Sequence, residues 1–173
     1  HIFRLVSFAR KNIMAIRYQV RPVNYAGTVE FVSKMQADVE NHTRKTNPLI
    51  DYGPYGKHLA VKELKAEDNY LLHKGKVIHS GLSMACGSLT KCEGVIKNSE
   101  VLEEDASLTY ELSVEEGKTY VFEKMIGYTC DFDIAEDKMI DFIKDELKKA
   151  MDLGYDEMEK LQKKHMDEFW SKA

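Results

Sequence analysis

The chain has 173 residues, of which 43% are hydrophobic and 31% charged, and its net charge is −4 at pH 7. This balance is typical of a folded globular protein, and no apolar run approaches the roughly 20 residues that a membrane-spanning helix needs. Lysines and arginines are interspersed with acidic residues, which argues against nucleic acid as a partner. Three cysteines without paired spacing argue against a disulfide framework. With no signal peptide visible, we expect a cytoplasmic location.

The first part of the chain predicts three consecutive β-strands within residues 2–35. Hydrophobic and polar side chains alternate along residues 13–20, which is the pattern of a half-buried strand. The same alternation runs along residues 28–35. Between these two segments, Pro22 cannot donate to a strand ladder and Gly27 tolerates turn dihedrals, so we predict a short connection there.

The strand pattern breaks at residues 36–58, which hold two of the three prolines. A structureless stretch of this length is uncommon in a compact domain unless it is functional or disordered. Its aromatic and hydrogen-bonding side chains are of the kind that contact sugars or anions. The candidate substrate-adjacent residues are Arg44, Tyr52, Tyr55, Lys57 and His58. An ordinary surface or interdomain loop explains the same composition, and on the residues alone it is the preferred interpretation.

Strand patterns resume after this segment. We predict strands at 58–65, 69–73 and 78–89, and small residues in the last of these indicate a bulge or the close approach of another backbone. We expect residues 91–107 to form an exposed segment that departs from the predicted strands.

The clearest strand pattern lies at residues 108–114, and a Glu-Glu-Gly turn joins it to another strand at 118–129. This arrangement is typical of a hairpin. In total, the sequence up to residue 129 predicts about eight consecutive strands without an intervening helix. Such an order predicts an antiparallel sheet or sandwich rather than alternating strands and helices.

After the last strand the hydrophobic period changes to that of a helix. Asp133 and Glu136 resemble a capping box at the start of a first helix, and Gly154 is a natural stop. A second helix opens near Asp156, and its apolar face includes His165. We interpret His165 as a packed, hydrogen-bonded histidine.

No sequence motif for catalysis stands out. The chain lacks the glycine-rich phosphate and dinucleotide loops, the HExxH zinc pattern, CxxC pairs and the GxSxG elbow. The six histidines do not show metal-ligand spacing, so no metal site is predicted. Carboxylates pair at 103–105 and 115–116, but in hydrophilic turns, whereas acid–base catalysis needs an apolar setting that raises one pKa. We therefore predict no catalytic residue in this chain.

Three blocks carry a family resemblance: RLVSF at residues 4–8, MAIRY at 14–18 and PVNYAG at 22–27. They resemble the amino-terminal domain of glycoside hydrolase family 65, which includes the maltose, trehalose, kojibiose and nigerose phosphorylases. Later segments fit the same pattern, among them GYD at 154–156. Residues 36–37 depart from it, because the family usually carries Asp-Gly there.

The resemblance implies a galactose-mutarotase-like antiparallel β-sandwich, partial in this chain, over residues 1–132. Two linker helices would follow at 133–173. In the family an (α/α)6 barrel comes next and carries the catalytic general acid, so the family's catalytic residues have no positions here. The sequence begins within a strand pattern and ends within a helix pattern, and we expect a fragment of a longer protein.

The resemblance also implies what the longer protein does. It would be an inverting disaccharide phosphorylase acting on an α-glucoside, with inorganic phosphate as co-substrate and no other cofactor, or a hydrolytic relative that uses water. Its expected partners are the catalytic barrel of the same polypeptide, an α-linked disaccharide and a second copy in a homodimer.

The alternative hypothesis is a stand-alone module that binds a small ligand or a carbohydrate without enzymatic activity. A helix would then lie across a concave sheet, and a cavity beneath it would be lined by Leu82, Met84 and Tyr110.

Overall fold

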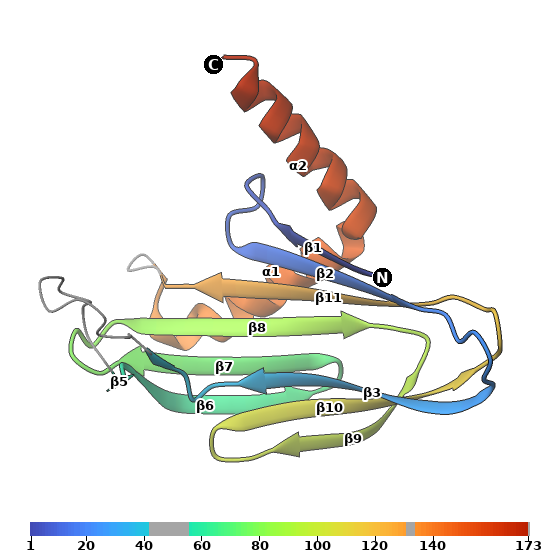
Figure 1. The fold of residues 1–173 in the computed structure, drawn as a ribbon. Helices are drawn as coiled ribbons and strands as arrows, with labels where there is room; N and C mark the ends of the chain where they lie inside the picture. Colours follow the sequence, from blue (N-terminus) through green and yellow to red (C-terminus); the bar gives the residue numbers. More distant parts are fainter. Residues whose placement is uncertain (42–55, 131–133, 173) are drawn as a thin grey trace, which may run out of the picture.

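The computed structural model describes residues 1–41, 56–130 and 134–172 and shows three layers (Figure 1). The main sheet is antiparallel, with its strands in the order β1-β2-β11-β8-β7-β6. These strands are β1 (Ile2–Val6), β2 (Ile13–Val20), β6 (Leu59–Glu67), β7 (Tyr70–Val77), β8 (Ser83–Lys91) and β11 (Tyr120–Thr129).

A small sheet packs on one face of the main sheet. Its antiparallel strands, in the order β3-β10-β9, are β3 (Gly27–Gln36), β9 (Val95–Val101) and β10 (Asp105–Val114). A two-stranded ribbon joins β4 (Glu40–Asn41) to β5 (Gly56–Lys57). The core between the two sheets is filled, with Leu71, Leu108 and Tyr110 each at most 1% exposed. Phe31 of β3 stacks on Phe122 of β11, with ring centroids 3.7 Å apart.

Helix α1 (Met139–Leu153) covers the opposite face of the main sheet, over β8 and β11. Its apolar stripe repeats at helical spacing, so that Ile143, Leu147 and Ala150 pack on Ala15, Met125 and other small or apolar side chains of the strands. A 3₁₀ turn at Glu136–Lys138 leads into this helix. The main sheet is therefore shared between two hydrophobic cores.

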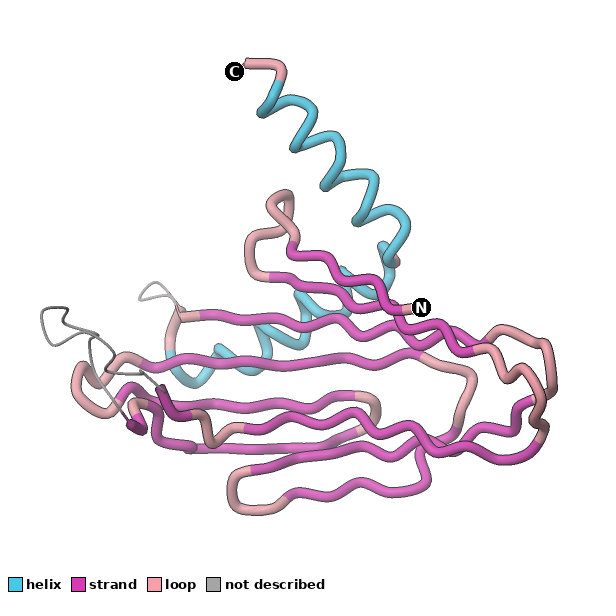
Figure 2. The backbone as a smooth tube through the Cα atoms, viewed as in Figure 1, coloured by secondary structure: helices cyan, strands magenta, loops and turns pink. Residues whose placement is uncertain are grey.

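Helix α2 (Tyr155–Trp170) projects away from the layers, as the backbone tube shows clearly (Figure 2). Gly154 separates it from α1 with φ at 80°, a left-handed conformation that favours glycine. Tyr155 and Met158 are buried at the base of α2, whereas Phe169 and Trp170 at its end are 58% and 64% exposed. No helix among the described residues is long and apolar enough to cross a membrane.

The structure confirms the predicted antiparallel sandwich followed by two helices, and the stop at Gly154. The prediction that residues 91–107 leave the sheets was wrong, because strand β9 forms there and pairs with β10. Both faces of β9 are exposed, so hydrophobic and polar residues do not alternate along it. The capping box was also wrong: Glu136 accepts a hydrogen bond from Ser83 Oγ instead of capping α1, and Asp133 lies outside the described residues.

The expectation for His165 was wrong too, since the residue is exposed and its ring stacks on Phe8 with centroids 5.8 Å apart. Helix α1 lies across the face of the main sheet, as the binding-module hypothesis requires. However, Tyr110, which that hypothesis places on a cavity wall, is buried in the filled core between the sheets.

Candidate functional site

The best candidate site lies around Asn41 and Gly56, the described residues on either side of segment 42–55. The ribbon of β4 and β5 holds these two points together through the pairs Glu40–Lys57 and Asn41–Gly56. Arg44, Tyr52 and Tyr55 lie outside the described residues, so the structure places only two of the five predicted candidates, Lys57 and His58.

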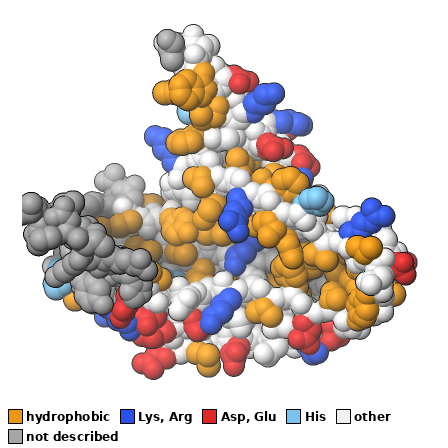
Figure 3. All heavy atoms as spheres, in the orientation of Figure 1, with side chains coloured by type: hydrophobic (Ala, Val, Ile, Leu, Met, Phe, Trp, Pro, Cys, Tyr) orange, Lys and Arg blue, Asp and Glu red, His pale blue; other side chains and the backbone are white. Residues whose placement is uncertain are grey.

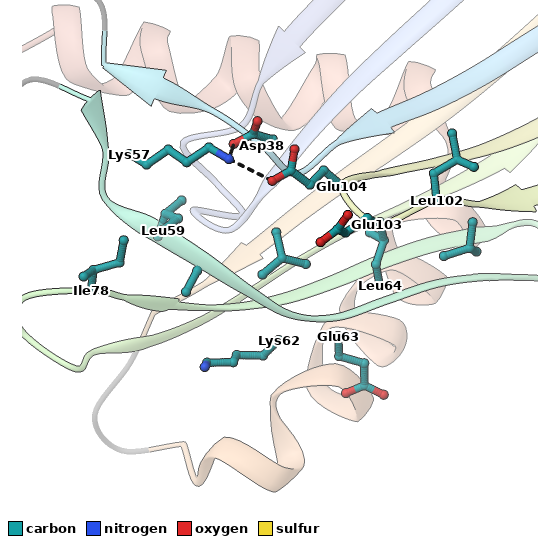
Figure 4. Close-up of a pocket in the computed structure, with 13 residues that line it drawn as sticks. Asp38, Lys57, Leu59, Lys62, Glu63, Leu64, Ile78, Leu102, Glu103 and Glu104 are labelled. Atoms are coloured by element: carbon teal, nitrogen blue, oxygen red, sulfur yellow. Dashed lines mark hydrogen bonds and ion pairs between the residues drawn. The ribbon is translucent and has the colours of Figure 1, made fainter.

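Lys57 is the centre of an ionic clasp with Asp38 and Glu104 (Figure 4). Its Nζ lies 2.7 Å from Asp38 Oδ1 and 2.8 Å from Glu104 Oε1. The hydrogen bond from Lys57 lowers the pKa of Asp38, and the bonds to Asp38 and Glu104 raise the pKa of Lys57. All three groups are partly exposed, so water and salt screen the attraction.

The clasp joins three segments that are distant in sequence: the end of β3, strand β5 and the turn between β9 and β10. The backbone supports it, since Ala37 N–H donates to Glu104 O at 2.8 Å. Because the charge of Lys57 is already matched by two carboxylates, Lys57 is better suited to fixing the ends of segment 42–55 than to binding an anion.

A cavity of about 520 Å³ lies beside the clasp. Its lining is mixed, and the aliphatic part includes Leu59, Val61, Leu64, Ile78, Val101 and Leu102. Charged residues also line it, including Lys62, Glu63 and Glu103, although the side chains of Lys62 and Glu63 point away from the clasp (Figure 4). The described lining contains no aromatic side chain on which a sugar ring could stack.

His58 lies at the start of β6 and belongs to the same corner of the molecule. Its carbonyl accepts a hydrogen bond from Ile78 N at 2.9 Å, and its ring centroid lies 5.9 Å from that of His79. Its Nε2 is buried and has no hydrogen-bond partner among the described residues. A buried nitrogen of this kind generally finds a water molecule or a ligand group.

The arrangement can position a segment, but it does not bring together the parts of a metal site. No group of three or more His, Cys, Asp or Glu side chains within 1–41, 56–130 and 134–172 could hold a metal ion. Sequence reasoning missed Asp38 and Glu104, because no local pattern links them to Lys57. Glu104 lies in a turn, as the sequence predicts, but its carboxylate is paired with Lys57.

Comparison with known proteins decides the family. The family model for the glycosyl hydrolase family 65 N-terminal domain matches residues 1–169. The chain belongs to glycosyl hydrolase family 65. This family 65 chain is 27% identical to the alpha,alpha-trehalose phosphorylase of Thermoanaerobacter brockii and 26% identical to that of Geobacillus stearothermophilus.

The matches cover 99% and 96% of this chain but only 23% and 21% of those two relatives. Among solved structures, a chain described as "Putative kojibiose phosphorylase from human microbiome" superposes with a TM-score of 0.79 at 12% identity. It covers 98% of this chain, which in turn covers 21% of that one, and it supports the fold alone. The family 65 chain described here therefore spans less than a quarter of the length of these relatives.

Proposed function

We propose that this chain is the non-catalytic amino-terminal domain and helical connection of an inverting disaccharide phosphorylase that acts on an α-glucoside with inorganic phosphate. The observation that carries the proposal is the extent of the match: nearly all of this chain aligns with two trehalose phosphorylases, yet it covers only about a quarter or less of each. The remaining length is sufficient for a separate catalytic domain in the same polypeptide.

The projecting helix supports this arrangement. The end of α2 presents Phe169 and Trp170 to solvent, next to the His165 ring that stacks on Phe8. Exposed aromatic side chains at the end of a projecting element are typical of a surface that another domain covers. In this proposal the catalytic barrel packs against that end of α2.

The clasp gives the segment 42–55 a fixed base in the same proposal. Arg44, Tyr52 and Tyr55 would contact the disaccharide held by the barrel, while Asp38, Lys57 and Glu104 hold the ends of the segment. We further propose a cytoplasmic, homodimeric enzyme with no cofactor besides phosphate as co-substrate.

The test is to express the longer polypeptide that contains this chain and incubate it with a panel of α-linked glucobioses in phosphate buffer. Inverting phosphorolysis predicts release of β-glucose 1-phosphate, the opposite anomer to the substrate linkage. The 173-residue chain alone is expected to release none. Free glucose as the only glucosyl product would identify a hydrolase, and no reaction on the whole panel would show that the proposal is wrong.

A variant tests the role of segment 42–55. Tyr52→Ala in the longer polypeptide is expected to lower kcat/KM, whereas the matched control Tyr25→Ala, in the turn before β3, leaves it unchanged. Equal effects of the two substitutions would contradict contact between the segment and the substrate.

A further inference from the structure

Three side chains with metal-binding atoms lie together on the side of the main sheet that faces the small sheet. His73 of β7 pairs with Cys86 of β8, and Gly75 pairs with Met84. Opposite residues of an antiparallel pair share a face of the sheet, as do residues two apart in one strand. Leu71, on the same face of β7, is buried in the core between the two sheets. The imidazole, the thioether and the thiol therefore project from one corner of the β7–β8 ladder.

Gly75 leaves a small space between the imidazole and the thioether. A Cβ atom placed on Gly75 would lie 3.1 Å from His73 Nε2 and 3.3 Å from Met84 Sδ. The two donor atoms thus border the same point, over a glycine that is itself buried. Any side chain at position 75 would occupy that point. The donors of β7 and β8 converge there and do not point apart.

The imidazole nitrogen at this point lacks a partner. His73 is only 4% exposed, and its Nε2 is buried without a hydrogen-bond partner among the described residues. A buried polar atom that stays unpaired costs free energy, so such an atom usually binds a water molecule or a ligand. A buried water needs two to four polar partners, whereas the register places the sulfur atoms of Met84 and Cys86 beside this nitrogen. The surroundings therefore suit a metal ion better than a water molecule.

Cys86 supplies the third donor of the set. It is a free, partly buried cysteine. Burial raises the pKa of the Cys86 thiol to about 11, while the positive charge of Lys124 acts in the opposite direction. The metal-free thiol is therefore protonated at neutral pH. Because the thiolate is the form that binds metal, an ion entering the site must displace this proton.

A cavity of about 380 Å³ gives access to the three donors from solvent. Met84 lines it, and so does Tyr128 of β11, which pairs with Cys86 across the ladder. The exposed thiol of Cys130 lines the same cavity. An ion can therefore reach Met84 and the neighbouring Cys86 without opening the core.

The chemistry of the donors selects the ion. Thiolate and thioether sulfur favour soft ions, and copper is also well suited to imidazole. On the face of the molecule shown in Figure 3, acidic side chains follow the lower rim and the projecting helix, whereas hydrophobic and basic side chains gather over the strands between them. Calcium and magnesium, which need several oxygen ligands, are therefore disfavoured there. Since one donor is a thioether, the set is distinct from clusters of His, Cys, Asp or Glu, and the described residues hold no such cluster of three that could bind a metal.

We propose that His73 Nε2, Met84 Sδ and the Cys86 thiolate bind one Cu(I) ion between β7 and β8. On binding, the Cys86 S–H bond breaks, its proton passes to solvent and the sulfur bonds to copper, which stays Cu(I). The charge of the thiolate balances that of the ion, as a buried site requires. Only the folded chain brings the three donors together, so the bound ion stabilises the fold. This site is independent of the proposed phosphorylase activity.

The first experiment titrates the 173-residue chain with Cu(I), in the absence of oxygen, against a coloured Cu(I) chelator. We expect one ion per chain and the release of about one proton. Met84→Leu and Cys86→Ser should each weaken binding at least about tenfold, because each removes a donor while nearly keeping the side-chain volume. The matched controls, Met125→Leu under α1 and Cys92→Ser, should leave the affinity unchanged. An affinity that is unchanged in Met84→Leu, or lost in Cys130→Ser, would overturn the proposal.

The second experiment fills the space between the donors and keeps all three of them. Gly75→Ala places a methyl group where the donors converge, so it should weaken Cu(I) binding at least about tenfold. Gly127→Ala adds a methyl group on the opposite face of the main sheet, under α1, and is the matched control. Circular dichroism checks that both variants fold, and Met84→Leu decides if Gly75→Ala does not. Native affinity in a folded Gly75→Ala would contradict a site at this point.

The third experiment identifies the ligands by X-ray absorption at the copper edge. The loaded chain should show sulfur and imidazole nitrogen bound to copper. The imidazole signal should disappear in His73→Leu, and the sulfur signal should weaken in Met84→Leu. Cu(I) should also raise the midpoint of thermal unfolding of the native chain, but not that of Cys86→Ser. Oxygen ligands in place of sulfur, or Zn²⁺ that binds as tightly as Cu(I), would show that the assigned ion is wrong.

Discussion

At the residue scale, Gly87 and Gly127 let α1 lie close to the main sheet. They are paired across β8 and β11, beneath the helix. A Cβ atom placed on Gly87 would lie 2.7 Å from Ile143 Cγ2 and 2.9 Å from Leu72 Cδ2, well inside normal contact. One placed on Gly127 would lie no closer than 3.4 Å to any side chain of the core. The two glycines therefore differ in how much space a methyl group would find.

We predict that Gly87→Ala lowers the free energy of unfolding by about 1–3 kcal/mol, because the added methyl group overpacks the core under α1. Gly127→Ala is the matched control and should cost clearly less. In Gly87→Ala/Ile143→Ala the clashing Cγ2 is gone, so the double variant should lose less than the sum of the single ones. Urea unfolding of Gly87→Ala, Gly127→Ala, Ile143→Ala and the double variant measures these losses, and strictly additive losses would contradict the packing argument.

His73 on β7 gives a pH prediction. Its side chain is buried, burial lowers its pKa below the ordinary value of 6.5, and its Nε2 has no hydrogen-bond partner among the described residues. The unfolded chain therefore binds a proton more readily than the folded one. This group's contribution to stability is complete above pH 6.5 and is lost progressively as the pH falls from 6.5 toward the lowered pKa.

We accordingly expect the free energy of unfolding to fall more steeply between pH 7 and pH 5 in the native sequence than in His73→Leu. The control substitution is His165→Leu, which removes a histidine that is exposed. Parallel curves for the native chain and His73→Leu would show that His73 is not the titrating group.

The sequence revealed some of these residues and not others. Small residues in the predicted strand at 78–89 indicated a bulge or the close approach of another backbone, whereas Gly87 lies against side chains, those of Leu72 and of Ile143 and Leu147 in α1. His165 was misplaced because helical periodicity identifies an apolar stripe but not whether another element covers it. The clasp of Asp38, Lys57 and Glu104 left no signal, since its members are brought together only by the long-range pairing of strands.

At the element scale, Arg17 of β2 holds the start of α2. Its Nη1 donates to Asp156 Oδ1 at 2.6 Å, and its Nε and Nη2 donate to Glu123 Oε1 at 2.9 and 2.7 Å. The guanidinium also lies 4.6 Å from the centre of the Tyr155 ring. The hydrogen bond to Asp156 is the main cause that raises the pKa of Arg17, and the same bond lowers the pKa of Asp156. These contacts fix the direction in which α2 leaves the main sheet after Gly154.

We predict that Arg17→Met lowers the free energy of unfolding by about 1–2 kcal/mol, because it leaves the poorly exposed Glu123 carboxylate without its partner. Hydrogen exchange in the first turn of α2 should become faster. The control is Lys160→Met, which removes a well-exposed ion pair with Glu157 and should change neither quantity. Unaltered exchange at the base of α2 in Arg17→Met would show that apolar packing alone directs the helix.

The elements themselves were largely predictable, because alternation and the 3.6-residue period reflect one buried face. β9 was missed because none of its residues is buried, so it has no buried face to produce such a pattern. The strand order could not be predicted. β2 pairs with β11, about a hundred residues away, and no local pattern names such a partner.

At the scale of the whole molecule, the main sheet buries one face against the small sheet and the other against α1. Leu71 on β7 is buried toward the small sheet and its neighbour Leu72 is buried toward α1. The predicted boundary at residue 132 separates a sandwich from linker helices, and it stays a prediction. In the structure, however, α1 shares one hydrophobic core with the strands, whereas the end of α2 contributes no buried side chain.

Two truncations test this difference. Ending the chain after residue 158 keeps Tyr155 and Met158, the two buried residues of α2, and should leave cooperative thermal unfolding in place. Ending it after residue 138 removes α1 and its four buried residues Met139, Ile143, Leu147 and Ala150. A fully buried large apolar side chain contributes about 1.5–3 kcal/mol, so three of them account for roughly 5–9 kcal/mol, as much as the whole stability of many domains. The shorter chain should therefore lose its cooperative transition. If it instead unfolds cooperatively near the temperature of the intact chain, the strands fold independently and α1 is a linker after all.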